Sequence, residues 1–199
     1  MRKVRISIIY HSRHGHTEQI ARFIEEQLNA PFSDVRSFSI EEAMEAQKFL
    51  HASDTIVFGS PTCLGNVSAG FSKFMEWTEC FWYKQLWKDK LASGFTVSPT
   101  VNGDKLHTLI SLSLFAAQHG MLWISQAVLP RFINDEQTDG QNRLGSYLGL
   151  MVQSNTSEEN FTAHPGDLLT AELFAKRILD ITRRLTSHSK IKSYDKNSN

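Results

Sequence analysis

Residues 4–17 have the sequence VRISIIYHSRHGHT, an apolar run that stops at a polar loop containing a single glycine. The run from Val4 to Tyr10 predicts a buried strand, and a helical pattern begins at Thr17. A helix N-terminus presents unpaired N–H groups and a positive dipole end, which favour an anion. The loop lacks a Walker A lysine and is not GxGxxG. It predicts a phosphate held by hydroxyls and backbone, as that of flavin mononucleotide (FMN) often is, although such residues are also ordinary caps and turns.

Length and charge exclude several classes of protein. The 199 residues suffice for one buried core, and we expect one FMN-binding domain over residues 1–185 and a polar, disordered tail over 186–199. Acidic and basic residues balance at 21 each, so no net field attracts nucleic acid or an anionic membrane. The longest apolar stretch, residues 109–117, is too short to cross a bilayer, and no secretory signal is expected. These features predict a cytoplasmic protein without nucleic-acid or membrane partners.

Strand-like and helical segments alternate along the chain. Strands are expected at residues 4–10, 34–40, 55–59, 91–97 and 121–128. Helices are expected at residues 17–28, 41–50, 68–79, 105–118 and 167–185. The alternation predicts an α/β, flavodoxin-like three-layer sandwich whose five-stranded parallel sheet has the order 2-1-3-4-5. Residues 130–165 lack periodicity and are expected to form a functional excursion.

Two further loops are expected beside the first. Gly59–Asn66 and Val97–Gly103 come at the ends of the third and fourth strands, and each contains proline and glycine. In such sheets a ligand binds beyond the carboxyl ends of the strands, where the strand order reverses. Proline fixes one turn and glycine frees another, so the backbone can bend close to a flat ligand. Three converging loops predict a nucleotide pocket, and a flavin needs N–H donors at its ring edge.

Four short motifs together resemble a known family. The motif S-x-x-G-H-T matches residues 12–17, G-[ST]-P-T-x-x-G-N matches 59–66, K-L-A-S matches 90–93, and H-G-M matches 119–121. Over most of its length the chain resembles the flavodoxin-like NAD(P)H:quinone oxidoreductases of the tryptophan-repressor-binding-protein (WrbA) type. The resemblance implies FMN as cofactor, NADH or NADPH as co-substrate and a quinone or similar small-molecule acceptor. It also implies a homodimer or homotetramer.

The resemblance further implies which residues surround the cofactor. Those expected at the phosphate are Ser12, His14, Gly15, His16 and Thr17. Those expected along the isoalloxazine in the second loop are Pro61, Thr62, Cys63, Leu64, Gly65 and Asn66. Those expected to approach the ring from the third loop are Ser98, Thr100, Asn102 and Gly103. His119 would reach the pyrimidine edge, and no catalytic side chain is required because FMN carries the chemistry.

The chain departs from the family pattern in its loops. Cys63 and Leu64 stand where the family usually has an arginine. Pro99 and Val101 stand in a loop that normally contains Thr-Gly-Thr, and residues 145–149, which include Ser146, match the family's G-[ST]-P-[YW]-G only loosely. These differences bear on nicotinamide affinity and acceptor choice more than on FMN binding.

Three residues have two interpretations each. His119 precedes Gly120 at an expected helix end, where it could stabilise the helix terminus instead of contacting the flavin. Trp82 could stack on the nicotinamide or a quinone, or it could belong to a core or subunit interface. Cys63 could be a perturbed thiol beside a flavin or a small buried apolar residue. The other histidines, and the two cysteines, lack metal-ligand spacing, so no metal site is expected.

The sequence supports three hypotheses about function. The first is an FMN-dependent oxidoreductase that transfers hydride from a nicotinamide through N5 of FMN to a quinone or similar acceptor. The alternative is a flavodoxin-type electron carrier with a protein redox partner, although such carriers tend to be strongly acidic and this chain is neutral. The third is an interaction protein that has lost flavin binding.

Overall fold

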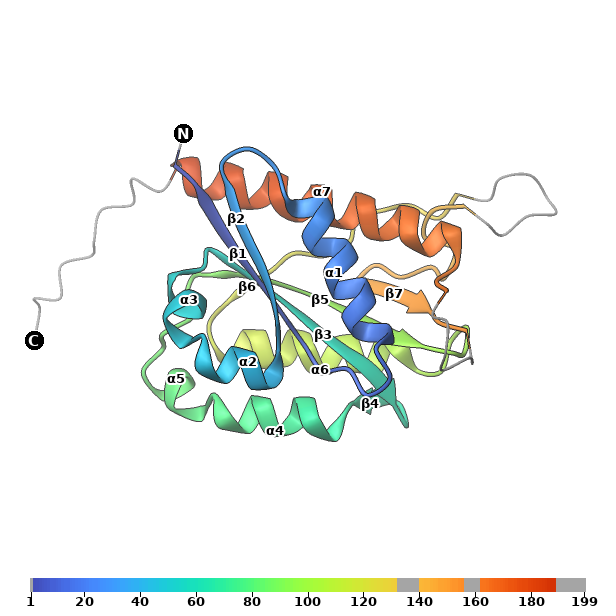
Figure 1. The fold of residues 1–199 in the computed structure, drawn as a ribbon, viewed down its shortest axis with the longest axis horizontal. Helices are drawn as coiled ribbons and strands as arrows, with labels where there is room; N and C mark the ends of the chain where they lie inside the picture. Colours follow the sequence, from blue (N-terminus) through green and yellow to red (C-terminus); the bar gives the residue numbers. More distant parts are fainter. Residues whose placement is uncertain (1, 132–139, 156–161, 189–199) are drawn as a thin grey trace, which may run out of the picture.

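A parallel β-sheet forms the middle layer of the molecule, with helices on both faces (Figure 1). The computed structural model describes residues 2–131, 140–155 and 162–188. The strands are β1 (Val4–Tyr10), β2 (Ser33–Ser39), β3 (Thr55–Cys63), β4 (Asn66–Val67), β5 (Leu91–Ser98), β6 (Leu122–Trp123) and β7 (Leu150–Gln153). The order β2-β1-β3-β5-β6, all parallel pairs, confirms the predicted flavodoxin-like 2-1-3-4-5 sheet, and β4 is a short antiparallel partner of β3.

The helices divide between the two faces of the sheet. One face is covered by α1 (His16–Leu28) and α7 (Pro165–His188). The other face is covered by α2 (Ile40–Glu45), α3 (Gln47–Ala52), α4 (Ala69–Trp77), α5 (Glu79–Tyr83) and α6 (Lys105–Gln118). Within the three described ranges, none of these helices combines the length with the apolar character that a membrane span needs.

Strand β1 is buried on both faces, as a central strand of a parallel sheet must be. Ile6 and Ile8 pack beneath α1 and α7, whereas Ile9 packs on the opposite face in the same cluster as Phe58. This division follows the two-residue period of a strand. Full burial of each such side chain stabilises the fold by about 1.5–3 kcal/mol.

The fifth strand position is built from two separate segments. β6 pairs with Leu91 and Ala92 at the start of β5, and β7 pairs with the last four residues of β5. The predicted strand over residues 121–128 is therefore wrong after Trp123, because the chain leaves the sheet there and rejoins it only at Leu150. The sequence pattern missed β7 because it lies inside the segment without periodicity.

Polar contacts and one close approach hold the excursion against the sheet edge. The main-chain N–H of Gln126 donates to the carbonyl of Tyr147 at 3.0 Å, and its side-chain amide donates to the carbonyl of Ser146 at 2.9 Å. A Cβ on Gly149 would lie 2.3 Å from the carbonyl oxygen of Gly94, so β7 can rejoin β5 only because residue 149 has no side chain. Residues 132–139 and 156–161 lie outside the described residues, and a functional role for the excursion stays a prediction.

Two helices differ from their predicted bounds. The helix expected over residues 41–50 is divided into α2 and α3 at Ala46, whose ψ of 23° departs from helical geometry. The last helix begins at Pro165, a residue type favoured in the first turn, and continues to His188. The expected tail therefore begins inside α7, and residues 189–199 lie outside the described residues.

An aromatic cluster fills the core beneath α4, α5 and α6. Within it the ring of His119 lies 4.7 Å from that of Trp87 and 4.8 Å from that of Phe115, and the residue is 1% exposed. Its Nε2 lies 3.0 Å from Oγ1 of Thr78. Burial disfavours the charged imidazolium and lowers the pKa of His119 to about 4. His119 is therefore a neutral packing residue of the core.

The buried His119 predicts an acid-sensitive stability. An unfolded chain takes up a proton on this histidine near its ordinary pKa of 6.5, whereas the folded protein does so only near pH 4. The wild-type free energy of unfolding should fall by about 3 kcal/mol over this window because of this residue, and His119→Gln should lack that fall.

Urea unfolding of both proteins at about pH 7 and about pH 4.5 gives the decrease in the free energy of unfolding between the two pH values. An equal decrease in the wild type and in His119→Gln would contradict the burial of a neutral imidazole.

Candidate functional site

The first loop carries the chain from β1 into α1. The main-chain N–H of His11 donates to the carbonyl of Gly59 on β3 at 3.0 Å, and the chain then leaves the sheet. Gly15 precedes α1 with a φ of 82°, a left-handed conformation that strains a residue with a Cβ. His16 and Thr17 follow in the first turn, where backbone N–H groups have no partner within the helix. Residues 11–17 thus place hydrogen-bond donors beyond the carboxyl ends of the strands.

A cavity of about 160 Å³ lies where three loops meet. Its walls come from the β1–α1 loop, the end of β3, the end of β5 and the residue after β7. The lining residues are Ser12, Arg13, His14, His16, Thr17, Pro61, Thr62, Cys63, Val97, Ser98, Pro99 and Ser154. All three predicted loops therefore contribute to one cavity, at the edge of the sheet where the strand order reverses.

Several predicted contacts lie outside the lining of this cavity. They are Gly15, Leu64, Gly65, Asn66, Thr100, Asn102 and Gly103. Leu64 and Gly65 form the tip of the β3–β4 hairpin with φ values of 47° and 78°, and Leu64 is 107% exposed. The side-chain oxygen of Asn66 accepts a hydrogen bond of 2.7 Å from the Ser111 hydroxyl, which ties this hairpin to α6.

His119 and Trp82 lie at the other end of the molecule and do not reach the cavity. His119 directly follows α6, whose 14 residues span about 20 Å from the loop after β5. Trp82 lies in α5, next to Phe81, whose ring lies 5.6 Å from that of Trp87, and the Trp87 ring in turn lies 4.7 Å from that of His119. The helix α5 is at the end of the sheet away from β4 (Figure 1). Neither residue lines the cavity formed by this chain, and the flavin contact of His119 and the stacking role of Trp82 stay predictions. Both come at or after the end of a crossover helix, which returns the chain to the opposite edge of the sheet.

Two hydroxyls of the lining have no hydrogen-bond partner among the described residues, namely Ser12 Oγ and Ser154 Oγ. Both oxygens are buried, and an unpartnered buried polar group costs about 1–3 kcal/mol. Hydroxyls in this state beside a helix N-terminus fit a ligand that supplies phosphate or other polar groups. The sequence did not indicate Ser154, because it follows the unpredicted strand β7.

A chain of threonine hydroxyls makes the β3 wall of the cavity rigid. Oγ1 of Thr62 lies 2.7 Å from Oγ1 of Thr96 and 2.9 Å from Oγ1 of Thr108. These contacts connect the end of β3 with β5 and α6. Thr62 and its neighbour Pro61 are thereby held in place from behind.

A buried lysine, which the sequence analysis did not single out, lies behind the loop after β5. The Nζ of Lys105 donates to the carbonyls of Thr100 and Val101. Burial lowers the pKa of Lys105 to about 8. The same loop is also attached to β7, because the side-chain amide of Gln153 donates to the carbonyl of Pro99 at 3.0 Å. The position of Lys105 in the first turn of a predicted helix, directly after the third loop, was the signal that could have indicated it.

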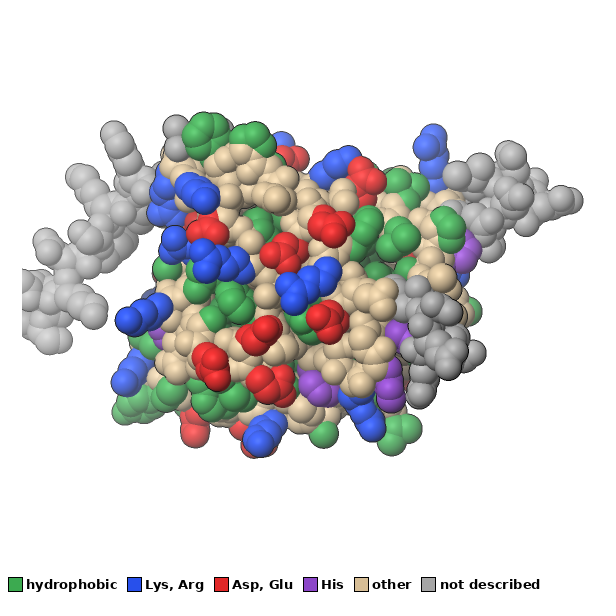
Figure 2. Space-filling model, viewed as in Figure 1, with side chains coloured by type: hydrophobic (Ala, Val, Ile, Leu, Met, Phe, Trp, Pro, Cys, Tyr) green, Lys and Arg blue, Asp and Glu red, His purple; other side chains and the backbone are tan. Residues whose placement is uncertain are grey.

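The cavity carries little fixed charge. Arg13 is the one lysine or arginine among the described residues that line it, and its side chain is exposed. Acidic and basic side chains are intermixed over the face shown in Figure 2, in line with their equal numbers. An anion in this cavity would therefore be held mainly by hydroxyls and by the N-terminus of α1.

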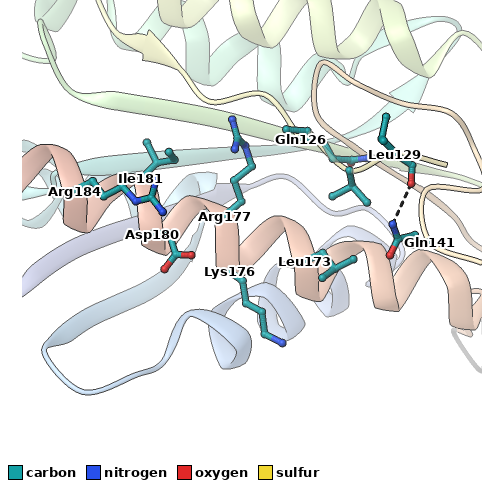
Figure 3. Close-up of a pocket in the computed structure, with 11 residues that line it drawn as sticks. Gln126, Leu129, Gln141, Leu173, Lys176, Arg177, Asp180, Ile181 and Arg184 are labelled. Carbon is teal, nitrogen blue, oxygen red and sulfur yellow. Dashed lines mark hydrogen bonds between the residues drawn. The ribbon is translucent and has the colours of Figure 1, made fainter. Parts of the chain in front are cut away.

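A larger hollow of about 530 Å³ lies between α7 and the excursion (Figure 3). Its walls include Gln126 and Leu129 from the excursion and Lys176 and Arg177 from α7. None of the residues that line it comes from the three loops at the strand ends. Despite its size, it is therefore separate from the candidate nucleotide site.

Comparison with known proteins agrees with this geometry. A family model described as "Flavodoxin domain" matches residues 7–119. Flavodoxin FldP of Pseudomonas aeruginosa (strain UCBPP-PA14) is 35% identical over 179 residues, which cover 89% of this chain and 96% of that protein. An NAD(P)H dehydrogenase (quinone) of Archaeoglobus fulgidus is 24% identical over 208 residues, with coverages of 91% and 98%. The crystal structure of a flavodoxin, WrbA-like protein from Agrobacterium tumefaciens has 32% identity and a TM-score of 0.69, with coverages of 91% and 98%.

The parallel sheet, the converging loops and these similarities define a flavin-binding, flavodoxin-like redox protein. The chain belongs to the flavodoxin family. Membership of this family implies FMN as the cofactor.

Removing either unpartnered hydroxyl should leave the cofactor-free protein at least as stable as the wild type. Ser12→Ala and Ser154→Ala lose no hydrogen bond within the described structure and remove a buried polar group without a partner, so the free energy of unfolding should stay the same or rise by up to about 1–3 kcal/mol. Ser68→Ala is the contrasting variant, because the Ser68 hydroxyl lies 2.7 Å from Nδ1 of His11 and accepts from the N–H of Phe71. It should lose about 1–2 kcal/mol.

Urea denaturation of the three cofactor-free variants measures these changes. A loss in Ser12→Ala as large as that in Ser68→Ala would show that Ser12 stabilises the fold and is not held ready for a ligand.

Proposed function

We propose that the cavity at the strand ends binds FMN and that the protein is an electron carrier for a protein redox partner. The observation that carries the cofactor assignment is the unpartnered Ser12 hydroxyl, which shares a cavity with the N-terminus of α1. The phosphate would lie against residues 12–17, where hydroxyls and backbone N–H groups can donate to its oxygens. The cavity offers this arrangement without needing a lysine.

The walls of the cavity would orient the ring of FMN. Residues 61–63 would cover one side, and Ser98 with its neighbours would cover the other. Residues 64–66 and 100–103 would approach the ring edges from the rim. When bound, FMN supplies reversible electron transfer, whereas the chain supplies position, hydrogen bonds and shelter from water.

The carrier function is favoured by flavodoxin FldP, which is 35% identical to this chain over 96% of its own length. The rim of the cavity agrees, because Leu64 and Val101 are largely exposed on the loops at the ends of β3 and β5. An apolar rim is suited to being covered by another protein. Residues 59–66 and 97–103 include no charged side chain, so docking would use apolar contact. This arrangement is compatible with a neutral carrier.

A quinone reductase is the second candidate function. It is supported by the 24% identical NAD(P)H dehydrogenase (quinone) and by the 32% identical WrbA-like protein. NADH or NADPH would then be the hydride donor, and a quinone the acceptor. Cys63 and Leu64 replace the arginine of the WrbA-type loop, which removes a cation that a nicotinamide nucleotide could contact. A homodimer or homotetramer stays a prediction under either function.

Affinity for FMN tests the phosphate end of the site. Ser12→Asp would place a carboxylate against the phosphate and should weaken FMN binding by roughly 100-fold or more, because like charges repel at close range. Riboflavin has no phosphate, so its binding should change little. Quenching of flavin fluorescence on titration with the cofactor-free protein measures both affinities.

Ser113→Asp is the matched control, because Ser113 lies on α6 and does not line the cavity. It should bind FMN like the wild type. Equal FMN affinity in the wild type and Ser12→Asp would show that residues 12–17 do not hold the phosphate.

Reduction of the FMN-loaded protein separates the two candidate functions. A carrier should stay oxidised with NADH or NADPH alone under anaerobic conditions, and should become reduced when a ferredoxin–NADP⁺ reductase is added with NADPH. The visible flavin absorbance follows the reaction. Rapid reduction by either nicotinamide alone, followed by stoichiometric reduction of benzoquinone, would contradict the carrier function and support the reductase.

A further inference from the structure

Lys105 places a buried cation directly behind the loop that follows β5. It is the first residue of α6 and is 0% exposed. Its Nζ donates to the main-chain carbonyl of Thr100 and, at 3.4 Å, to that of Val101. Residues 97–99, just before these two, line the candidate flavin cavity. The ammonium is thus attached to the loop that forms one wall of the cavity.

Besides Lys105, the residues at and just after the end of β7 attach to the start of the loop. The Gln153 amide donates to the carbonyl of Pro99 at 3.0 Å, and the N–H of Ser154 donates to that of Ser98 at 3.1 Å. The hydroxyls of Ser98 and Thr100 lie 3.4 Å apart, at the long end of hydrogen bonding. Gly103 and Asp104 have φ values of 53° and 56°, so two left-handed residues in succession precede α6. This conformation strains Asp104, which has a Cβ. The shape of the loop therefore depends on contacts from neighbouring elements.

The ammonium also controls which way the loop peptides point. In a trans peptide the carbonyl and the following N–H point in opposite directions. Since the carbonyls of Thr100 and Val101 are directed toward Lys105, the N–H groups of Val101 and Asn102 are directed away from it. Both residues are exposed.

Stability alone does not explain a lysine at this position. The dipole of α6 repels a cation at its N-terminus. Asp167 at the start of α7 attracts the ammonium, but Asp167 is already paired with Arg143 at 2.8 Å, and Arg143 repels it. Burial outweighs the attraction of Asp167 and, together with the repulsion of Arg143, lowers the pKa of Lys105 to about 8. An apolar side chain of similar length would cost less to bury.

We propose that Lys105 is a positioning residue of the flavin site, whose charged ammonium holds residues 98–102 in the conformation that receives the cofactor. The inference rests on the proposed FMN site and adds a requirement to it. Affinity for FMN depends on the charge of a side chain that does not line the cavity. Below about pH 8 the lysine is charged and holds the two carbonyls through charge-assisted hydrogen bonds. Above it the neutral amine makes only weaker hydrogen bonds, so the loop is held less firmly.

Lys105→Met tests the proposal against a matched variant at the opposite end of the sheet. Lys90 is partly buried, and its Nζ donates to two main-chain carbonyls, those of His51 and Ser53, at 2.7 and 2.6 Å. Lys90→Met therefore removes the same kind of contact away from the cavity. FMN titration at about pH 7 and about pH 9 compares both variants with the wild type.

We expect wild-type FMN affinity to fall roughly tenfold or more from about pH 7 to about pH 9. Lys105→Met should bind FMN roughly tenfold or more weakly than the wild type does at about pH 7, and its affinity should be the same at both pH values. Lys105→Arg keeps its charge at the higher pH and should bind more tightly there than Lys105→Met. Lys90→Met should follow the wild-type profile. A wild-type affinity and pH profile in Lys105→Met would overturn the proposal.

Hydrogen exchange on the cofactor-free protein gives a readout that does not depend on FMN. In Lys105→Met the amides that donate to carbonyls of this loop, those of residue 105 (to Asn102) and Ser154 (to Ser98), should lose protection, whereas the amide of His11, which donates to Gly59, should not. Unchanged protection of the amides of residues 105 and 154 would overturn the role of Lys105. Selective loss of protection in a protein that does not bind FMN would instead overturn the proposed function and leave the loop attachment standing.

Discussion

Tyr10 of β1 and Gly59 of β3 pair side by side, and beyond this pair the two chain segments must separate because α1 packs on one face of the sheet and α4 on the other. The separation leaves a space at the strand ends that neither helix fills. Backbone N–H groups of α1 and the wall formed by Thr62 both border this space. The position of every other part of the candidate site is set relative to this divergence of two parallel strands.

At each end of the sheet a lysine ammonium donates to main-chain carbonyls, but the two lysines have different roles. At the amino end, Lys90 donates to the carbonyls of His51 and Ser53 and closes the core beside the aromatic cluster. At the carboxyl end, Lys105 donates to carbonyls of a loop that borders the cavity. A buried ammonium carries a desolvation cost in both places. For Lys105, the proposed return for this cost is a fixed conformation of the loop after β5, which lowers the entropy lost when a ligand binds.

The carrier and the reductase share one FMN site and differ at its rim. Leu64 and Val101 make the rim apolar and uncharged, where an arginine is usual in the WrbA type. Such a rim favours contact with another protein over the phosphates of a nicotinamide nucleotide. A neutral chain with intermixed surface charges would accordingly dock with little electrostatic steering (Figure 2).

The residues themselves determined the bounds of β1 and α6 and the alternation of strands and helices, because burial periods and turn residues are local in the sequence. The strand order and the convergence of three loops were expected from this alternation together with the general rules for parallel sheets. The tertiary structure alone decided that β7 completes the fifth strand position and brings Ser154 into the cavity, that Lys105 lies behind a loop, and that His119 and Trp82 lie at the far edge. Each of these depends on contacts between segments far apart in the chain, and such contacts leave no local pattern in the sequence.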